Sequence, residues 1–116
     1  MTLQAGWTMA DVERQLERDL PADLLHVAIA VSLDPPDCAW AENVCIRLAA
    51  HRDANESGNA ILGFGHLARL CGTLDEARVR PLIDAALADP SDYVRGQAHA
   101  AAGDLGHFLG WRGLPE

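Results

Sequence analysis

The chain has 116 residues, a length that fits one domain with one hydrophobic core. Hydrophobic residues make up 49% of it, which excludes compositional disorder, and only 5% are aromatic, while alanine is abundant; this balance favours helices packed on helices. The formal net charge of −8 disfavours nucleic-acid partners, and the absence of lysine excludes Schiff-base chemistry and P-loop phosphate binding.

Helix start signals stand out from the first residues onward. Thr8, with Asp11 three residues later, predicts a capped helix over 9–19. Pro21 stands at a favoured first helical position and predicts a second helix over 21–33. The second helix is apolar nearly all round, so we expect it to be buried.

Four further helices follow, joined by short turns. They are predicted over 37–50, 55–70, 75–88 and 92–109. Asp37 and Asp75 are the predicted N-caps of two of them, and Gly72 and Gly110 end two others. Six helices with short connections indicate an α-solenoid or a helical bundle.

Internal repetition favours the solenoid. When the segment 44–72 is shifted by 38 residues it falls on 82–110 without a gap, and glycines at three helical positions coincide. The coinciding pairs are Gly58 with Gly96, Gly65 with Gly103, and Gly72 with Gly110. The sequence therefore predicts an all-α fold, a short α-solenoid of about six helices in two to three helical hairpins. The hairpins of this single domain, 1–116, are 8–33, 37–72 and 75–110.

The stretch VRPLIDAALADPSDYVRGQAHAAAGDLGHFL resembles a HEAT repeat. The likeness is carried by Pro81 inside the first helix, the Asp89-Pro90 turn, and Val94-Arg95 opening the second helix. In that family the turn aspartate and the following arginine form a ladder between repeats. The resemblance implies this role for Asp89 and Arg95.

The other hairpins depart from the HEAT pattern. The hairpin 37–72 has His51 at the place of the turn aspartate and Glu56-Ser57 at the place of Val-Arg. A continuous ladder is therefore not expected. The first pair, 8–33, matches only as a helical hairpin and is interpreted as a degenerate N-terminal cap.

A second resemblance concerns function. The string GNAILGFGHLARLCGTLD, followed by YVRGQAHAAAGDLGHFLGW, is similar to small HEAT-like immunity proteins of bacterial polymorphic toxin systems. It implies a protein-binding inhibitor that neutralises one cognate toxin, with no cofactor. One alternative is a general adaptor or assembly factor, and another is a small metal- or cofactor-handling protein that uses the histidines.

Catalytic and metal-binding signals are absent from the sequence. No nucleophile-elbow, Walker or dinucleotide-binding motif occurs, and no His-Glu step like that of the iron-binding HEAT enzymes. His99, Asp104 and His107 have spacings that place them on different helix faces. We therefore predict no enzyme activity, no catalytic residue and no metal site.

Cysteine usage and the N-terminus indicate a compartment. The chain has three cysteines, Cys38, Cys45 and Cys71, and no CxxC pair, which suggests neither a disulfide framework nor a zinc site. Buried core thiols are the default expectation. The first residues do not resemble a signal peptide and no apolar run is long enough for a bilayer, so a cytoplasmic location with no membrane partner is expected.

Second helices of a solenoid line its concave face, the usual docking side. Polar side chains follow two of these helices. The predicted groove residues are Asn59, Gly63 and His66 on one helix and Tyr93, Gln97 and Asp104 on the next. Tyrosine is a common interface hot spot, so this face predicts a protein contact, and the alternative is a merely solvated face. Gly63 either opens the groove to the partner or packs tightly between repeats.

Acidic residues gather at two turns that stacking would bring side by side. Asp53 and Glu56 belong to one turn, and Asp89 and Asp92 to the next. A negative rim there would attract a basic toxin domain and speed its encounter. The alternative is that these residues are ordinary caps at helix starts.

Overall fold

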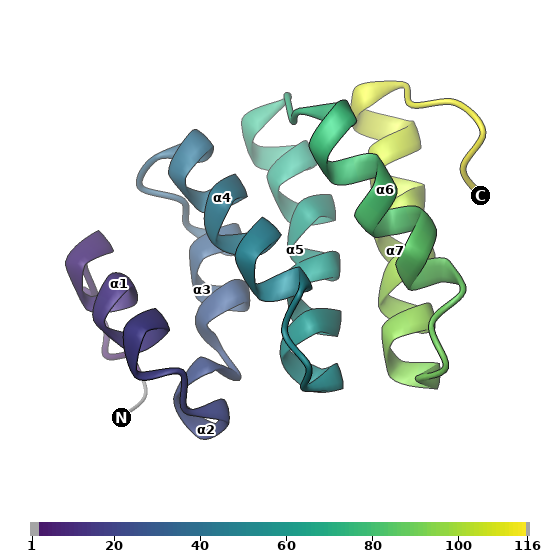
Figure 1. Cartoon of the computed structure of the whole chain (residues 1–116). Coiled ribbons are helices and arrows are strands. Elements are labelled where there is room, and N and C mark those ends of the chain that lie inside the picture. Colours follow the sequence, from purple (N-terminus) through teal and green to yellow (C-terminus); the bar gives the residue numbers. More distant parts are fainter. Residues whose placement is uncertain (1–2, 116) are drawn as a thin grey trace.

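The computed structural model describes residues 3–115 and is all-helical, as the sequence predicts. Seven helices follow one another in this part of the chain: α1 (Met9–Arg18), α2 (Pro21–Leu24), α3 (Val27–Leu33), α4 (Cys38–Ala49), α5 (Ala54–Cys71), α6 (Glu76–Leu87) and α7 (Asp92–Leu109). None of them combines the length and apolar composition that a membrane-crossing helix needs. They stack as three hairpins in two layers, with α1, α4 and α6 in one layer and α3, α5 and α7 in the other (Figure 1).

The predicted helix over 21–33 is wrong as a single element. The structure breaks it at Leu25 and His26, which form a turn between α2 and α3. The break leaves the carbonyl oxygen of Leu25 outside the helical ladder, and the side-chain amide of Asn59 donates a hydrogen bond to it at 2.8 Å. A side chain far along the chain thus satisfies the broken helix, and local sequence signals do not reveal such a partner.

Helix α5 is the centre of the core. It lies between α3 and α7 and is buried along most of its length, including Phe64 and Leu67. Helix α3 buries Val27 and Val31, as its apolar run predicts, whereas Leu33 at its end is exposed.

The predicted repeat is confirmed by the helix bounds. Adding 38 to the bounds of α4 and α5 gives those of α6 and α7. The N-caps of α5 and α7, Asp53 and Ser91, share φ −78° and ψ 124°. Their C-caps, Gly72 and Gly110, are both left-handed, with φ of 70° and 69°, a conformation that favours glycine. The two hairpins therefore have the same backbone design.

Helix α1 begins at the predicted capping box and is tied to α4 by side chains. Thr8 accepts from the backbone N–H of Asp11, and the Asp11 carboxylate accepts from that of Thr8 at 2.8 Å. Trp40 is half-buried; its indole N–H donates to Glu13 at 2.9 Å and its ring stacks on Trp7. These contacts place α1 against the first helix of the second hairpin.

The expectation that the cysteines form no disulfide is wrong. Cys38 at the start of α4 and Cys71 at the end of α5 form a disulfide, with their Cα atoms 6.1 Å apart. The two helices form an antiparallel hairpin, so residues 33 apart in the sequence meet at its open end. Cys45 is buried and free, as expected, and burial, followed by the charge of Glu42, raises the pKa of its thiol to about 12.

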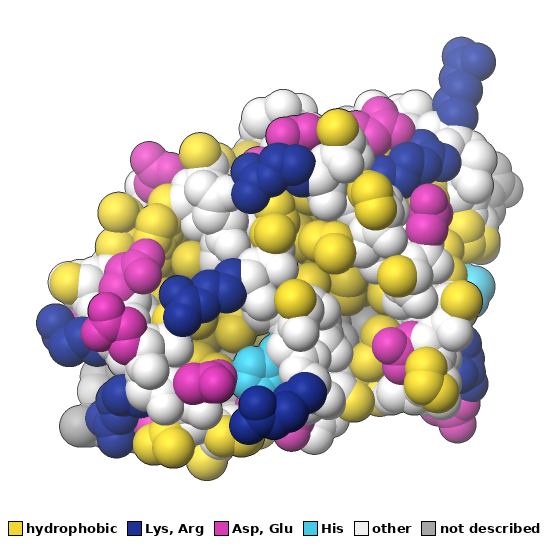
Figure 2. Space-filling view, in the orientation of Figure 1, with side chains coloured by type: hydrophobic (Ala, Val, Ile, Leu, Met, Phe, Trp, Pro, Cys, Tyr) yellow, Lys and Arg dark blue, Asp and Glu magenta, His cyan; other side chains and the backbone are white. Residues whose placement is uncertain are grey.

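Charges on the layer of α1, α4 and α6 are mixed. Figure 2 shows acidic and basic side chains interspersed with apolar ones over this face, with no large area of one sign. The net charge of −8 is therefore not concentrated on this side of the molecule.

Candidate functional site

Three of the predicted groove residues meet where α7 packs on α5. The Tyr93 hydroxyl donates to the side-chain oxygen of Asn59, and the Gln97 amide donates to the Tyr93 hydroxyl at 3.0 Å. Asn59 is only 4% exposed, whereas the tyrosine remains 44% exposed. Because Asn59 also holds the Leu25 carbonyl, the chain of hydrogen bonds runs from α7 through α5 to the turn before α3.

A glycine forms the seat of the tyrosine ring. A Cβ atom on Gly58 would lie 2.8 Å from both Cδ2 and Cε2 of Tyr93, closer than such atoms approach. Only glycine therefore lets the ring approach α5 this closely here. We call Gly58, Asn59, Tyr93 and Gln97 the Tyr93 platform. Three of its members were predicted from the sequence, but Gly58 was not, since its only signal was its match with Gly96 in the repeat.

The remaining groove residues lie further along the same two helices. Arg69 contacts the Nδ1 atom of His66 at 3.5 Å, and Asp104 lies where a Cβ on Gly65 would come within 2.7 Å of its carboxylate. Partial burial, and then the charge of Arg69, lower the pKa of His66, while Asp104 opposes the shift. His66 is therefore a neutral hydrogen-bonding group at pH 7, not a cation.

Gly63 does not belong to this surface. It is buried against α3 and α4, and a Cβ atom there would lie 3.0 Å from the Cys45 sulfur and 3.2 Å from the Ser32 side chain. Of the two explanations for this glycine, the geometry supports tight packing between helices.

Half of the predicted acidic rim is accounted for by hydrogen bonds to the backbone. The Asp53 carboxylate accepts from the N–H of Asn55 at 2.9 Å and of Glu56 at 3.3 Å, as an N-cap does. Asp89 accepts from the N–H two residues on, at 2.8 Å. Of the four, only Asp92 is almost fully exposed, with 95% of its side chain accessible. Capping therefore explains two of the four rim residues.

The resemblance implied that Asp89 and Arg95 take part in a ladder between repeats, but their contacts lie within one turn. Arg95 pairs with the Asp92 carboxylate and donates to the Asp89 carbonyl oxygen at 2.5 Å. All three residues lie in the connection between α6 and α7 or in the first turn of α7. The arginine thus links residues within the α6–α7 hairpin.

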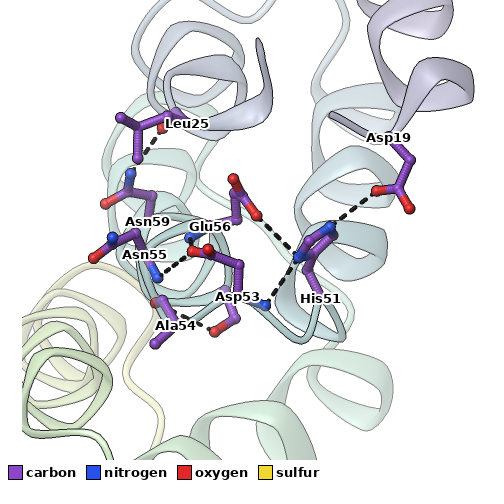
Figure 3. Close-up of polar contacts among 9 residues, drawn as sticks. Asp19, Leu25, His51, Asp53, Ala54, Asn55, Glu56 and Asn59 are labelled. Atoms are coloured by element: carbon purple, nitrogen blue, oxygen red, sulfur yellow. Dashed lines mark hydrogen bonds and ion pairs between the residues drawn. The ribbon is translucent and has the colours of Figure 1, made fainter. Parts of the chain in front are cut away.

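The fourth rim residue, Glu56, is not on the surface at all. It is 1% exposed, and its Oε2 atom lies 2.9 Å from Nδ1 of His51 (Figure 3). The other ring nitrogen, Nε2, lies 2.9 Å from the carboxylate of Asp19, and the backbone N–H of Asp53 donates to Nδ1 at 3.0 Å. One imidazole therefore bridges a carboxylate at the end of α1 and a buried carboxylate on α5. We call Asp19, His51 and Glu56 the His51 bridge.

Burial raises the pKa of Glu56, and the negative charges of Asp53 and Asp19 raise it further, against the opposing effect of His51 and Arg52. Nothing in the sequence indicated this cluster except that His51 departs from the HEAT pattern. A pocket of about 490 Å³ adjoins it, and its lining includes Arg47 and Arg52 but no serine, threonine or cysteine.

The geometry of the His51 bridge is that of a structural network. Both ring nitrogens already have partners, so neither is free to act on a substrate. Among residues 3–115 no group of three or more His, Cys, Asp or Glu side chains is arranged to hold a metal ion.

No family model matches the chain, and no curated protein or solved structure matches it. Function must therefore be inferred from the two side-chain arrangements themselves. Of the two, the Tyr93 platform presents an exposed ring at the surface, whereas His51 and Glu56 of the His51 bridge are largely buried.

Proposed function

We propose that this chain is a protein-binding inhibitor, an immunity protein that binds and neutralises one cognate bacterial toxin, and that the Tyr93 platform is the centre of its contact surface. The observation that carries the proposal is a half-exposed tyrosine held by two hydrogen bonds on a glycine seat. Tyrosine contributes a large contact area together with a polar tip, which makes it a frequent interface anchor.

The fixed position of the ring favours binding energetically. An exposed side chain normally loses rotamer freedom when a partner covers it, at about 0.5–1.5 kcal/mol. Here that freedom is already lost in the free protein, because Asn59 and Gln97 hold the hydroxyl and Gly58 supports the ring. The platform is thus organised before the partner arrives.

Charge supports a basic partner. The chain carries a net charge of −8, and Asp92, directly before Tyr93 in the sequence, is almost fully exposed. Such a field would accelerate the approach of a basic toxin domain and would make association weaken with salt. The partial neutralisation of Asp92 by Arg95 leaves the tyrosine, and not the rim, as the main source of affinity.

The platform contains no histidine, cysteine or carboxylate, and its members are a glycine, two amides and a phenol. This favours a binding role over the alternative of a metal- or cofactor-handling protein. A general adaptor would use the same surface, so the partner, not the geometry, separates it from an inhibitor.

The test combines capture with neutralisation. The tagged chain is used to capture partners from its native cells in moderate salt, and the bound proteins are identified and expressed alone. We expect one stoichiometric basic protein, encoded beside this chain, that stops growth unless the chain is co-expressed. Several unrelated partners without toxicity would instead establish the adaptor.

The Tyr93→Ala variant should lose capture and protection, whereas Phe108→Ala should keep both. Phe108 is a matched control because it is another exposed aromatic of α7, 42% accessible, and is not a member of the platform. Equal protection by Tyr93→Ala and the unaltered chain would refute the platform as the contact surface.

A further inference from the structure

Helix α1 is the least firmly built part of the stack. It has 10 residues, and helices this short are marginal in water unless packing holds them. Its buried apolar contribution consists of Val12 and Leu16. Side-chain ties to the second hairpin therefore matter for keeping it in place.

Three such ties connect α1 or its end to α4 and the turn after it. Glu13 accepts from the Trp40 indole at 2.9 Å, and Arg47 donates to the Leu16 carbonyl at 3.2 Å. The third tie is the contact between Asp19 and His51. Asp19 is the C-cap of α1 and has φ 53°, a left-handed conformation that L-residues rarely adopt. The left-handed conformation ends α1, and the half-exposed Asp19 side chain meets His51 there.

The third tie depends on how many protons the bridge holds. A neutral imidazole has one N–H, and here it faces two carboxylates, Asp19 at Nε2 and Glu56 at Nδ1. If ring and Glu56 together carry one additional proton, both contacts are satisfied with that proton on Glu56 and a neutral ring protonated at Nε2, because Nδ1 is then an acceptor, as its hydrogen bond from the backbone N–H of Asp53 requires. If that proton leaves, the ring can donate to only one of the two carboxylates.

The ring N–H should then donate to the buried carboxylate of Glu56. Glu56 is 1% exposed and cannot turn to water, whereas the Asp19 side chain is half-exposed and can be hydrated. The ring proton would then move from Nε2 to Nδ1, and the lone pair left at Nε2 would repel the Asp19 carboxylate. The backbone N–H of Asp53 would lose its acceptor at the same step.

We propose that His51 relays the protonation state of Glu56 to Asp19, and so sets how firmly helix α1 is held against the second hairpin. Helix α1 is held while the bridge keeps its additional proton and is loosened when the proton leaves at higher pH. This regulation is independent of the proposed function, because it concerns a different part of the molecule.

Every charged group facing the buried carboxylate enters this balance. Asp53 and Asp19 favour retention of the proton, while Arg52 favours its loss. Burial acts in the same direction as the two aspartates, and the pKa of Glu56 is raised. The loosening therefore takes place above the pH range in which an ordinary glutamate titrates.

The test follows α1 and the ring separately between pH 5 and 9. Hydrogen exchange, corrected for its intrinsic dependence on pH, should show the opening equilibrium constant of α1 rising about tenfold. That change corresponds to a difference of about one unit between the pKa of the bridge with α1 closed and its pKa with α1 open. Over the same range the ¹⁵N shifts of His51 should change from an Nε2-protonated to an Nδ1-protonated ring.

Two variants separate the relay from general effects of pH. In Glu56→Gln the neutral amide can donate to Nδ1 at every pH, so α1 should stay protected throughout. Glu17→Gln removes an exposed carboxylate of α1 and should keep the pH dependence of the unaltered chain. A constant α1 opening in the unaltered chain, or an unchanged pH dependence in Glu56→Gln, would overturn the proposal. If Glu56→Gln does not fold, an Nε2-protonated ring up to pH 9 in the unaltered chain overturns it.

Discussion

The internal repeat supplies a matched pair of substitutions that tests the tyrosine seat. Gly58 and Gly96 occupy the same place in successive repeats, 38 residues apart, and both lie inside long helices. A Cβ on Gly58 would meet the Tyr93 ring at 2.8 Å, whereas nothing lies within 4 Å of one on Gly96. The same change, glycine to alanine, is therefore expected to have opposite effects at the two positions.

The magnitudes follow from two contributions. Alanine in place of glycine within a helix contributes about 1 kcal/mol to the free energy of unfolding, and Gly96→Ala should gain that amount. At Gly58 the same gain is opposed by overpacking, about 1–3 kcal/mol, because the ring cannot withdraw while Asn59 and Gln97 hold its hydroxyl. The free energy of unfolding of Gly58→Ala should thus be about 1–3 kcal/mol lower than that of Gly96→Ala.

Urea denaturation followed by circular dichroism measures both variants. The decisive control is the double variant Gly58→Ala/Tyr93→Ala compared with Tyr93→Ala alone, because removing the ring removes the clash. In that background Gly58→Ala should stabilise the protein by about 1 kcal/mol, as Gly96→Ala does. Equal stabilisation by Gly58→Ala and Gly96→Ala in the intact chain would refute the glycine seat.

Three further predictions concern the disulfide, the free thiol and the buried carboxylate. Replacing Cys38 and Cys71 by serine should lower the free energy of unfolding by about 4 kcal/mol, the entropy of a loop closed over 33 residues, and should abolish any effect of reductant on the melting temperature. Native Cys45, with its pKa near 12, should resist alkylation at pH 8 until the protein is unfolded; rapid labelling would contradict its burial. Because the folded-state pKa of Glu56 is above its ordinary value of 4.5, stability should be greatest below that value and fall as pH rises through the folded pKa. The Glu56→Gln variant should lack this decline in urea titrations at a series of pH values.

Local signals in the sequence predicted the fold well, because caps and glycine stops act within a few residues. The capping box at Thr8, the N-cap at Asp37 and the left-handed Gly72 and Gly110 are all present. The repeat also predicted the α6–α7 hairpin from α4–α5. These features depend on backbone geometry that neighbouring residues determine.

Most of the features that the sequence did not reveal join residues distant in the chain. The disulfide links residues 33 apart, and Asn59 caps a helix break 34 residues before it. Glu56 looked like a surface acid at a helix start, but its side chain is buried and contacts His51 in the preceding turn. Pairings of this kind follow from tertiary packing, which helical periodicity does not specify.

Departures from the repeat coincide with both proposals. Tyr93 stands where the preceding repeat has Asn55. The platform is therefore specific to the place where α7 packs on α5 and is not required by the fold. Glu56 stands where the next repeat buries Val94. Since a buried valine fills the equivalent position of the next repeat, packing alone does not explain a buried carboxylate at this one.

This comparison gives a final prediction. Glu56→Val introduces the side chain that the molecule itself uses at the equivalent position, and it removes the charge that must otherwise be desolvated. We expect the variant to be as stable as the unaltered chain at pH 5 and more stable at pH 8, with His51 free to keep its proton on Nε2 for Asp19. Urea titrations at the two pH values measure this difference. If Glu56→Val were instead strongly destabilised at both, the carboxylate would be a requirement of the fold, and its departure from the repeat would not indicate a proton relay.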